Sequence, residues 1–166
     1  GSNTRVFRLG KGDELYRRSV YTFFKRTSPP PQMVLFDSAD RNMCSVRRSA
    51  TNTALQALLL MNDTQHVEAA RSLATRAMHH SPEDITIIYR MFRYTLGRSP
   101  SERERTLLLD GVTYYRGQYA EDPEAANALI ATGQSPPPSN ILADELAAWT
   151  MIATTILNLD ETVTRP

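Results

Sequence analysis

Two proline-led helix starts in the second half of the sequence constrain the fold of this chain more than any other feature. The stretches Ser81-Pro82-Glu83-Asp84 and Ser99-Pro100-Ser101-Glu102 each place a hydroxyl, a proline and acidic side chains in the order favoured at a helix N-terminus. Apolar residues then recur at helical spacing up to Gly97, a residue that suits the left-handed end of a helix. These signals predict a helical fold.

The same signals extended over the chain predict an all-α fold, a single domain of about six helices. A first helix is expected over 14–26, capped by Asp13, and Ser28-Pro29-Pro30-Pro31 ends it. The aromatic and β-branched residues from Val20 to Phe24 would also suit a strand. Asp63 and Asp122 are expected to cap two further helices. The last helix is expected over 143–159 with Trp149 on its apolar face.

The boundaries expected from this pattern leave little of the chain outside the helical domain. Gly1-Ser2 resembles an expression scar, 3–12 a flexible lead-in, 13–160 the helical domain and 161–166 a loose tail. Residues 32–49 are expected to be extended or irregular, and they are rich in arginine. An irregular segment of this length is often functional.

Positive charge is concentrated at the start of the chain. Residues 1–50 hold ten lysines and arginines against four acidic residues, whereas residues 51–166 hold nine against fourteen. The basic part could pack on the acidic helical part. Alternatively it forms an anion-binding surface, because arginine grips carboxylate, phosphate or sulfate with two hydrogen bonds. The sequence leaves both interpretations open.

Several classes of site are not indicated by the sequence. The single cysteine, Cys44, allows no internal disulfide, the haem-attachment pattern C-x-x-C-H is absent, and the three histidines lack a metal-ligand spacing. We therefore expect no metal and no cofactor in this part of the protein. No apolar run is long enough for a membrane span, and no nucleic-acid-binding motif is present.

The polar residues between Asp37 and Asp63 form the best candidate site. Its arginines beside amides would suit an anion or a polyhydroxyl ligand, and Asn52, Gln56 and Asp63 are expected to share a helix face. The alternative is structural: Arg47 and Arg48 pair with acidic neighbours and pin the segment. The candidate ligand-binding residues are Asp37, Asp40, Arg41, Arg47, Arg48, Asn52 and Gln56.

Several stretches together carry a resemblance to a known family. They are Arg17-Arg18-Ser19-Val20-Tyr21-Thr22-Phe23-Phe24-Lys25-Arg26, Phe36-Asp37 to Arg41, Arg47-Arg48 with Thr51-Asn52-Thr53-Ala54-Leu55-Gln56-Ala57-Leu58 and Asn62-Asp63, and Glu145-Leu146-Ala147-Ala148-Trp149 with Leu157-Asn158-Leu159-Asp160-Glu161. In this order they resemble the planctomycete-specific C-terminal domain of unknown function (number fifteen fifty-three). That family is found in large exported proteins that contain a cytochrome c-like module.

The resemblance implies a periplasmic or otherwise exported multidomain protein, of which this chain is a C-terminal portion. Any haem would belong to the upstream part, and the upstream domains are the expected partners. The family has no established catalytic residues to carry over, so we do not expect this fragment to be an enzyme by itself.

Three functions follow as hypotheses. The first is an interaction or docking domain. The second is a binding site for an anionic carbohydrate, sulfated ones included, through Arg41, Arg47 and Arg48. The third is a portion of a hydrolytic or redox enzyme that uses Asp37 and Asp40, a carboxylate pair whose separation the sequence does not fix.

The carbohydrate hypothesis yields a direct prediction. If the arginines contact the ligand, a sulfated oligosaccharide will raise the melting temperature in a salt-sensitive way, and Arg47→Ala will abolish the shift. A thermal-shift titration against sulfated and neutral oligosaccharides at low and moderate salt checks this. Unchanged binding in the variant would contradict these contacts.

Overall fold

The computed structural model describes residues 10, 12–25, 28–39 and 51–164 of the 166-residue chain. The chain divides into two compact units, residues 1–59 and 60–166. The described residues form eight α-helices and two short 3-10 helices, with one isolated bridge between Lys25 and Ser28 as their only β-type pairing. The predicted all-α class is therefore confirmed.

The first unit differs most from the sequence-based prediction. The prediction of a helix over 14–26 is wrong, because this part of the chain forms two 3-10 helices, Gly12–Tyr16 and Ser19–Tyr21. Asp13 lies inside the first of them and does not cap a longer helix. The run from Val20 to Phe24 is β-branched and aromatic, and such residues lose side-chain freedom in a helix.

Helices α1 (Pro31–Leu35) and α2 (Ala54–Asn62) follow. The first corrects the expectation that 32–49 is irregular throughout, because five residues are helical from Pro31 onward. A proline at the first helical position costs no hydrogen bond, since that N–H would lack a partner within the helix. The rest of that segment, 40–50, lies outside the described residues.

The second unit follows the sequence signals closely. It contains α3 (Thr64–Met78), α4 (Asp84–Thr95), α5 (Glu102–Glu121), α6 (Pro123–Ile130), α7 (Ala143–Leu157) and α8 (Asp160–Val163). Asp63 and Asp122 cap α3 and α6 as predicted, and Gly97 adopts φ 72° directly after α4 and its C-cap residue. Among the described residues, no helix combines the length and apolar character of a bilayer span.

Both proline-led helices begin two residues later than their predicted starts. The cap of α4 is Glu83, and the Ser81 hydroxyl instead accepts a hydrogen bond from the Glu83 N–H at 3.2 Å. The capping box of α5 uses Ser101 and Glu104. For α5, Ser99 with Glu102 and Ser101 with Glu104 both satisfy the S-x-x-E pattern, so sequence spacing alone did not distinguish the two starts.

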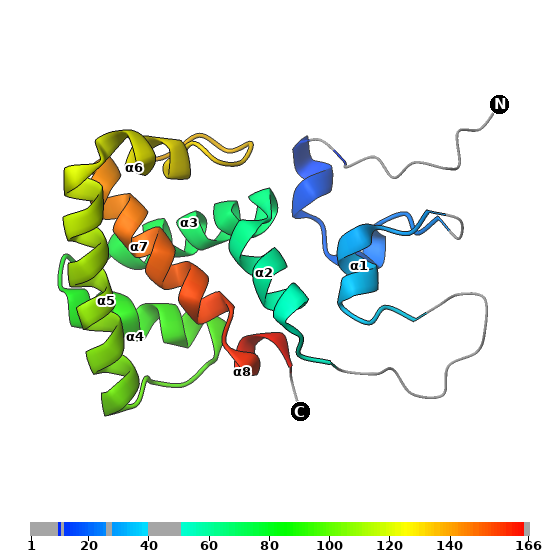
Figure 1. Ribbon diagram of the computed structural model, residues 1–166, viewed down its shortest axis with the longest axis horizontal. Helices are drawn as coiled ribbons and strands as arrows, with labels where there is room; N and C mark the ends of the chain where they lie inside the picture. The colour runs from blue at the N-terminus through cyan, green and yellow to red at the C-terminus, as the bar shows by residue number, and fades with distance from the viewer. Residues whose placement is uncertain (1–9, 11, 26–27, 40–50, 165–166) are drawn as a thin grey trace. The chain divides into compact units, whose positions relative to one another are not determined.

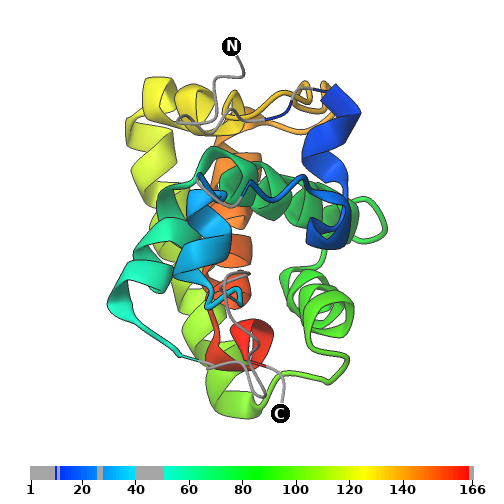
Figure 2. The same ribbon diagram turned by 90° about the vertical axis from the view of Figure 1, so that its right-hand side faces the viewer.

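Helix α7 is the centre of the second unit. It packs against α3, α5, α6 and α4, and both views show it running through the middle of these helices (Figure 1, Figure 2). Its buried residues occupy nearly every position rather than one stripe, which is typical of a helix covered on all sides. They are Leu146, Ala147, Ala148, Trp149, Thr150, Ile152, Ala153, Thr154 and Ile156.

Small residues on α5 and α3 let these neighbouring helices approach α7 closely. Gly111 of α5 faces the Ile152 side chain, where an added Cβ would lie 3.1 Å from the Ile152 Cδ1 atom. Ala70 and Ala74 of α3 are completely buried in the same core. Small side chains at such crossings reduce the distance between helix axes.

The chain continues in a helix where the sequence predicts a loose tail. Helix α8 begins after Leu159, and the Thr162 hydroxyl donates to the Ile156 carbonyl of α7 at 2.9 Å. Glu161 also accepts hydrogen bonds from Arg98. These contacts with α7 and with Arg98 hold residues 160–163 against the rest of the unit.

Trp149 provides the test of this core. Its side chain is fully buried, so Trp149→Ala should lower the free energy of unfolding by about 3–5 kcal/mol through lost burial and the cavity left behind. Chemical denaturation measures this. The matched control is Leu107→Ala on α5, where the side chain is 61% exposed and the expected change is within about 0.5 kcal/mol. Equal effects of the two substitutions would contradict the assignment of Trp149 to the core.

Candidate functional site

Three of the seven predicted ligand-binding residues lie in the described part of the chain. These are Asp37, Asn52 and Gln56. The other four, Asp40, Arg41, Arg47 and Arg48, lie outside the described residues, and so does Cys44. The proposed arginine contacts and the Asp37–Asp40 carboxylate pair therefore stay predictions.

Asp37 joins the two described flanks of the arginine-rich segment. Its Oδ2 atom accepts hydrogen bonds from the Thr51 N–H at 2.8 Å and the Thr51 hydroxyl at 2.6 Å. The backbone of Asp37 has φ 53°, a left-handed conformation that aspartate tolerates better than most residues. Its carboxylate thus takes part in fixing the chain where α1 ends.

Gln56 is the most buried polar residue of this unit, with 1% of its surface exposed. Its side-chain oxygen accepts from the Thr53 N–H at 2.8 Å, which completes a capping box at the start of α2 with the Thr53 hydroxyl. Its side-chain nitrogen donates to the Leu35 carbonyl at 2.8 Å and to the Thr51 hydroxyl at 3.1 Å. Gln56 therefore links α1 to α2.

Asn52, Gln56 and Asp63 do not share a helix face, contrary to the prediction. Helix α2 begins at Ala54, so Asn52 precedes it, and Asp63 follows its end. Asp63 caps α3 by accepting from two backbone N–H groups, and the same oxygen lies 3.1 Å from Nδ1 of His66. The prediction extended helical spacing from 52 to 63, whereas α2 occupies only Ala54–Asn62 and Asp63 caps the next helix.

The first unit exposes an unusual stretch of large side chains. We call Tyr16–Phe23 the aromatic–basic segment. Tyr16, Val20, Tyr21 and Phe23 are 59%, 74%, 71% and 78% exposed, and the two arginines between them are also exposed. Tyr16, Val20 and Tyr21 lie in two short 3-10 helices and Phe23 follows the second, so the local backbone does not bury an apolar face. Tyrosine and arginine together are typical of protein interfaces.

The second unit contains a buried ion pair that the sequence analysis missed. Glu68 and Arg71 of α3 are 4% and 2% exposed. Glu68 accepts from the N–H groups of Gln134 at 2.9 Å and Ser135 at 2.8 Å, while Arg71 donates to the Ser135 carbonyl at 2.6 Å and to the Ile130 carbonyl. The burial of Glu68 and Arg71 could have been inferred from the sequence, because both residues lie beside apolar positions of α3 that are buried.

These two side chains fix the path of the connection after α6. Gly133 adopts φ 107°, and an added Cβ there would collide with the Glu68 carboxylate. A residue with a side chain would be strained in conformation and also blocked in space. The proline-rich connection that follows is thus held to α3 at its first residues.

A second arginine joins three helices around the tryptophan. Arg116 of α5 donates to both carboxylate oxygens of Asp84 at the start of α4, at 2.6 and 2.8 Å, and its Nε donates to Glu145 of α7 at 2.7 Å. Glu145 also accepts from the Trp149 indole N–H at 2.8 Å. The hydrogen bonds to Glu145 and then Asp84 raise the pKa of Arg116 above its usual value.

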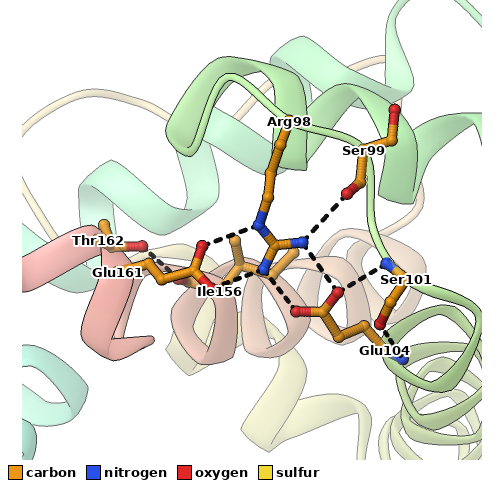
Figure 3. A network of polar contacts seen from close by, with 7 residues as sticks. All are labelled: Arg98, Ser99, Ser101, Glu104, Ile156, Glu161 and Thr162. Atoms are coloured by element: carbon orange, nitrogen blue, oxygen red, sulfur yellow. Dashed lines mark hydrogen bonds and ion pairs between the residues drawn. The ribbon is translucent and has the colours of Figure 1, made fainter.

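A third arginine fastens α8 to the rest of the unit (Figure 3). Arg98 donates to Glu104 at 2.7 and 2.9 Å and to Glu161 at 2.8 and 3.0 Å. These hydrogen bonds, those to Glu104 first, raise the pKa of Arg98 above its ordinary value. The hydrogen bonds from Arg98, with smaller contributions from Ser101, lower the pKa of Glu104 to about 2, against the opposing effect of burial.

The second unit also contains an open pocket of about 410 Å³ between the C-terminal half of α3 and the proline-rich connection. Arg71 forms part of its wall, and Arg76, His79 and His80 add further basic side chains. The sequence indicated only that the three histidines, His79 and His80 among them, lack a metal-ligand spacing. Local spacing does not show that residues 135–138 return to face α3.

The comparisons with known proteins identify the family. The family model described as PSD1, Protein of unknown function (DUF1553), matches residues 2–112. The chain belongs to this family. A search of curated proteins and a search of solved structures found no match.

The family match covers the aromatic–basic segment, Asp37, Gln56 and the Glu68–Arg71 pair. It starts earlier than the resemblance noted from the sequence, which began near Asp13, and it ends within α5. The stretches 145–149 and 157–161, which contributed to that resemblance, lie beyond the matched residues.

The Arg98 cluster predicts a specific dependence of stability on pH. Because the pKa of Glu104 is lowered from 4.5 to about 2 in the folded chain, its contribution is complete above about pH 4.5 and is lost as pH falls toward 2. We expect Glu104→Gln to lower the melting temperature at pH 6 and to have a much smaller effect near pH 3.

The matched control for this pH experiment is Glu102→Gln, two residues earlier on α5. Glu102 is 87% exposed and pairs only at 3.3 Å with Arg105, so its substitution should change the melting temperature little at either pH. Thermal denaturation of the three proteins from pH 3 to pH 6 measures the difference. An equal pH dependence of the wild type and Glu104→Gln would contradict the role given to Glu104.

Proposed function

We propose that this chain is an interaction domain that docks on an acidic and partly apolar protein surface through its aromatic–basic segment, Tyr16–Phe23. The expected partner is another domain of the same longer protein. The observation that carries the proposal is the exposure of Val20, Tyr21 and Phe23, each of which is more than 70% exposed.

Burial of these side chains would supply the driving force. Large apolar side chains grouped on a soluble protein surface are typical of interaction sites, and each fully buried one contributes about 1.5–3 kcal/mol. Tyrosine and phenylalanine also lose little rotamer freedom when they bind, because each has only two side-chain torsions. A segment of this composition therefore suits a docking role.

The positive charge of the first fifty residues supports the proposal that the partner surface is acidic. Arg17 and Arg18 lie between the exposed aromatic side chains, and residues 1–50 carry a surplus of six positive charges. Arginine at an interface can form bidentate hydrogen bonds with carboxylates, which fixes the orientation of the partner. Complementary charge also accelerates association.

Hydrogen exchange in the full-length parent protein tests this proposal. The amides of 16–23 should exchange quickly in the isolated chain, because only short 3-10 helices protect them, and markedly more slowly in the parent protein. Tyr21→Ser with Phe23→Ser should remove the extra protection. Equal exchange in the isolated chain and the parent would overturn docking within the same protein.

The matched control replaces two comparably exposed side chains elsewhere. Leu107 and Tyr114 of α5 are 61% and 62% exposed, and Leu107→Ser with Tyr114→Ser should leave the protection of 16–23 unchanged. Sedimentation of the isolated chain at increasing concentration distinguishes a further outcome. Protection that appears only with self-association would assign the surface to a second copy and contradict the proposed partner.

A further inference from the structure

The pocket on α3 has a wall that is fixed before any ligand arrives. Glu68 and Arg71 hold the backbone of Ser135 through both its N–H and its carbonyl. Pro136 and Pro138 then form the apolar side of the pocket, and proline limits the conformations of this connection. A preformed wall reduces the entropy lost on binding.

The charges that line this pocket have one sign. Its charged and protonatable lining residues in the described part of the chain are Arg71, Arg76, His79 and His80. This contrasts with residues 51–166 as a whole, where acidic residues outnumber lysine and arginine by five. The nearby buried carboxylate of Glu68 already accepts hydrogen bonds from Gln134 and Ser135.

The two arginines that line the pocket, Arg71 and Arg76, make different contacts. Arg71 is 2% exposed and donates to the carbonyls of Ile130 and Ser135, so it shapes the wall. Arg76 is exposed, and its guanidinium carbon lies 4.3 Å from the centre of the Tyr94 ring. Stacking of this kind leaves the N–H groups at the guanidinium edge available as donors.

A simpler explanation covers only part of this arrangement. Basic side chains at a helix C-terminus compensate the negative end of the helix dipole, which accounts for Arg76 or His79. It does not account for a pocket of about 410 Å³ between them and a proline wall. That volume is in the range of small-molecule sites.

We propose that this pocket binds a small tetrahedral oxyanion ester, a phosphate or sulfate group carried on a compact ring. Arg76, His79 and His80 face the oxyanion, because three basic side chains suit a group with several oxygens and more charge than one carboxylate. The ring lies against Pro136 and Pro138. This site is in the second unit and is independent of the proposed docking segment.

A titration of the isotope-labelled chain tests the proposal with four hexose probes. Glucose 6-phosphate, glucose 6-sulfate, glucuronate and glucose share a ring and differ in the charged group. We expect either ester to shift the amide resonances of Ser72, Thr75 and Ser135, with little effect from glucose. The two esters distinguish phosphate from sulfate recognition. Equal shifts with glucuronate or glucose, or no shift with either ester, would overturn the proposal.

Variants assign the binding to the named side chains. Arg76→Gln should weaken ester binding about tenfold or more, as expected for a lost hydrogen bond to a charged group. Arg103→Gln, an exposed arginine on α5 outside the pocket, should bind as the wild type does. Should Arg76→Gln fail to fold, His79→Gln with His80→Gln provides the second test. Unchanged binding in a folded pocket variant would overturn the assignment.

Discussion

The burial of α7 is the constraint on which the second unit depends. Trp149 is fully enclosed, and its indole N–H would be costly without a partner. Glu145 accepts that hydrogen bond and also binds Arg116, which in turn holds Asp84. The central helix is therefore connected to α4 and α5 by charge-assisted hydrogen bonds as well as by apolar packing.

The other two arginine clusters act at the edges of this core. Arg98 fastens α8, and Arg71 with Glu68 fastens the connection after α6. The cost of removing two charges from water offsets much of their mutual attraction in a buried ion pair. We therefore assign the Glu68–Arg71 pair to the selection of one path for the chain rather than to net stability. The path selected here brings a proline wall opposite the basic end of α3, and this creates the pocket.

The first unit is organised differently, because the large side chains of its aromatic–basic segment are exposed to solvent. Gln56 and Asp37 fix the backbone around α1 and α2 through hydrogen bonds to Leu35 and Thr51. Tyr21 and Phe23 remain exposed beside the arginines. The exposed aromatic side chains of the aromatic–basic segment support the proposal of an interaction domain, and the family to which the chain belongs has no assigned function.

The sequence by itself determined the all-α class, the caps at Asp63 and Asp122, the stop at Gly97 and the buried position of Trp149. These depend on hydrogen bonds and periodicity within a few residues, which the order of residues records. Tertiary structure alone decided the rest. Arg71 meets Ser135 across 64 positions, and Arg98 meets Glu161 across 63. Contacts of this kind depend on which helices pack together, and local spacing carries no record of that packing.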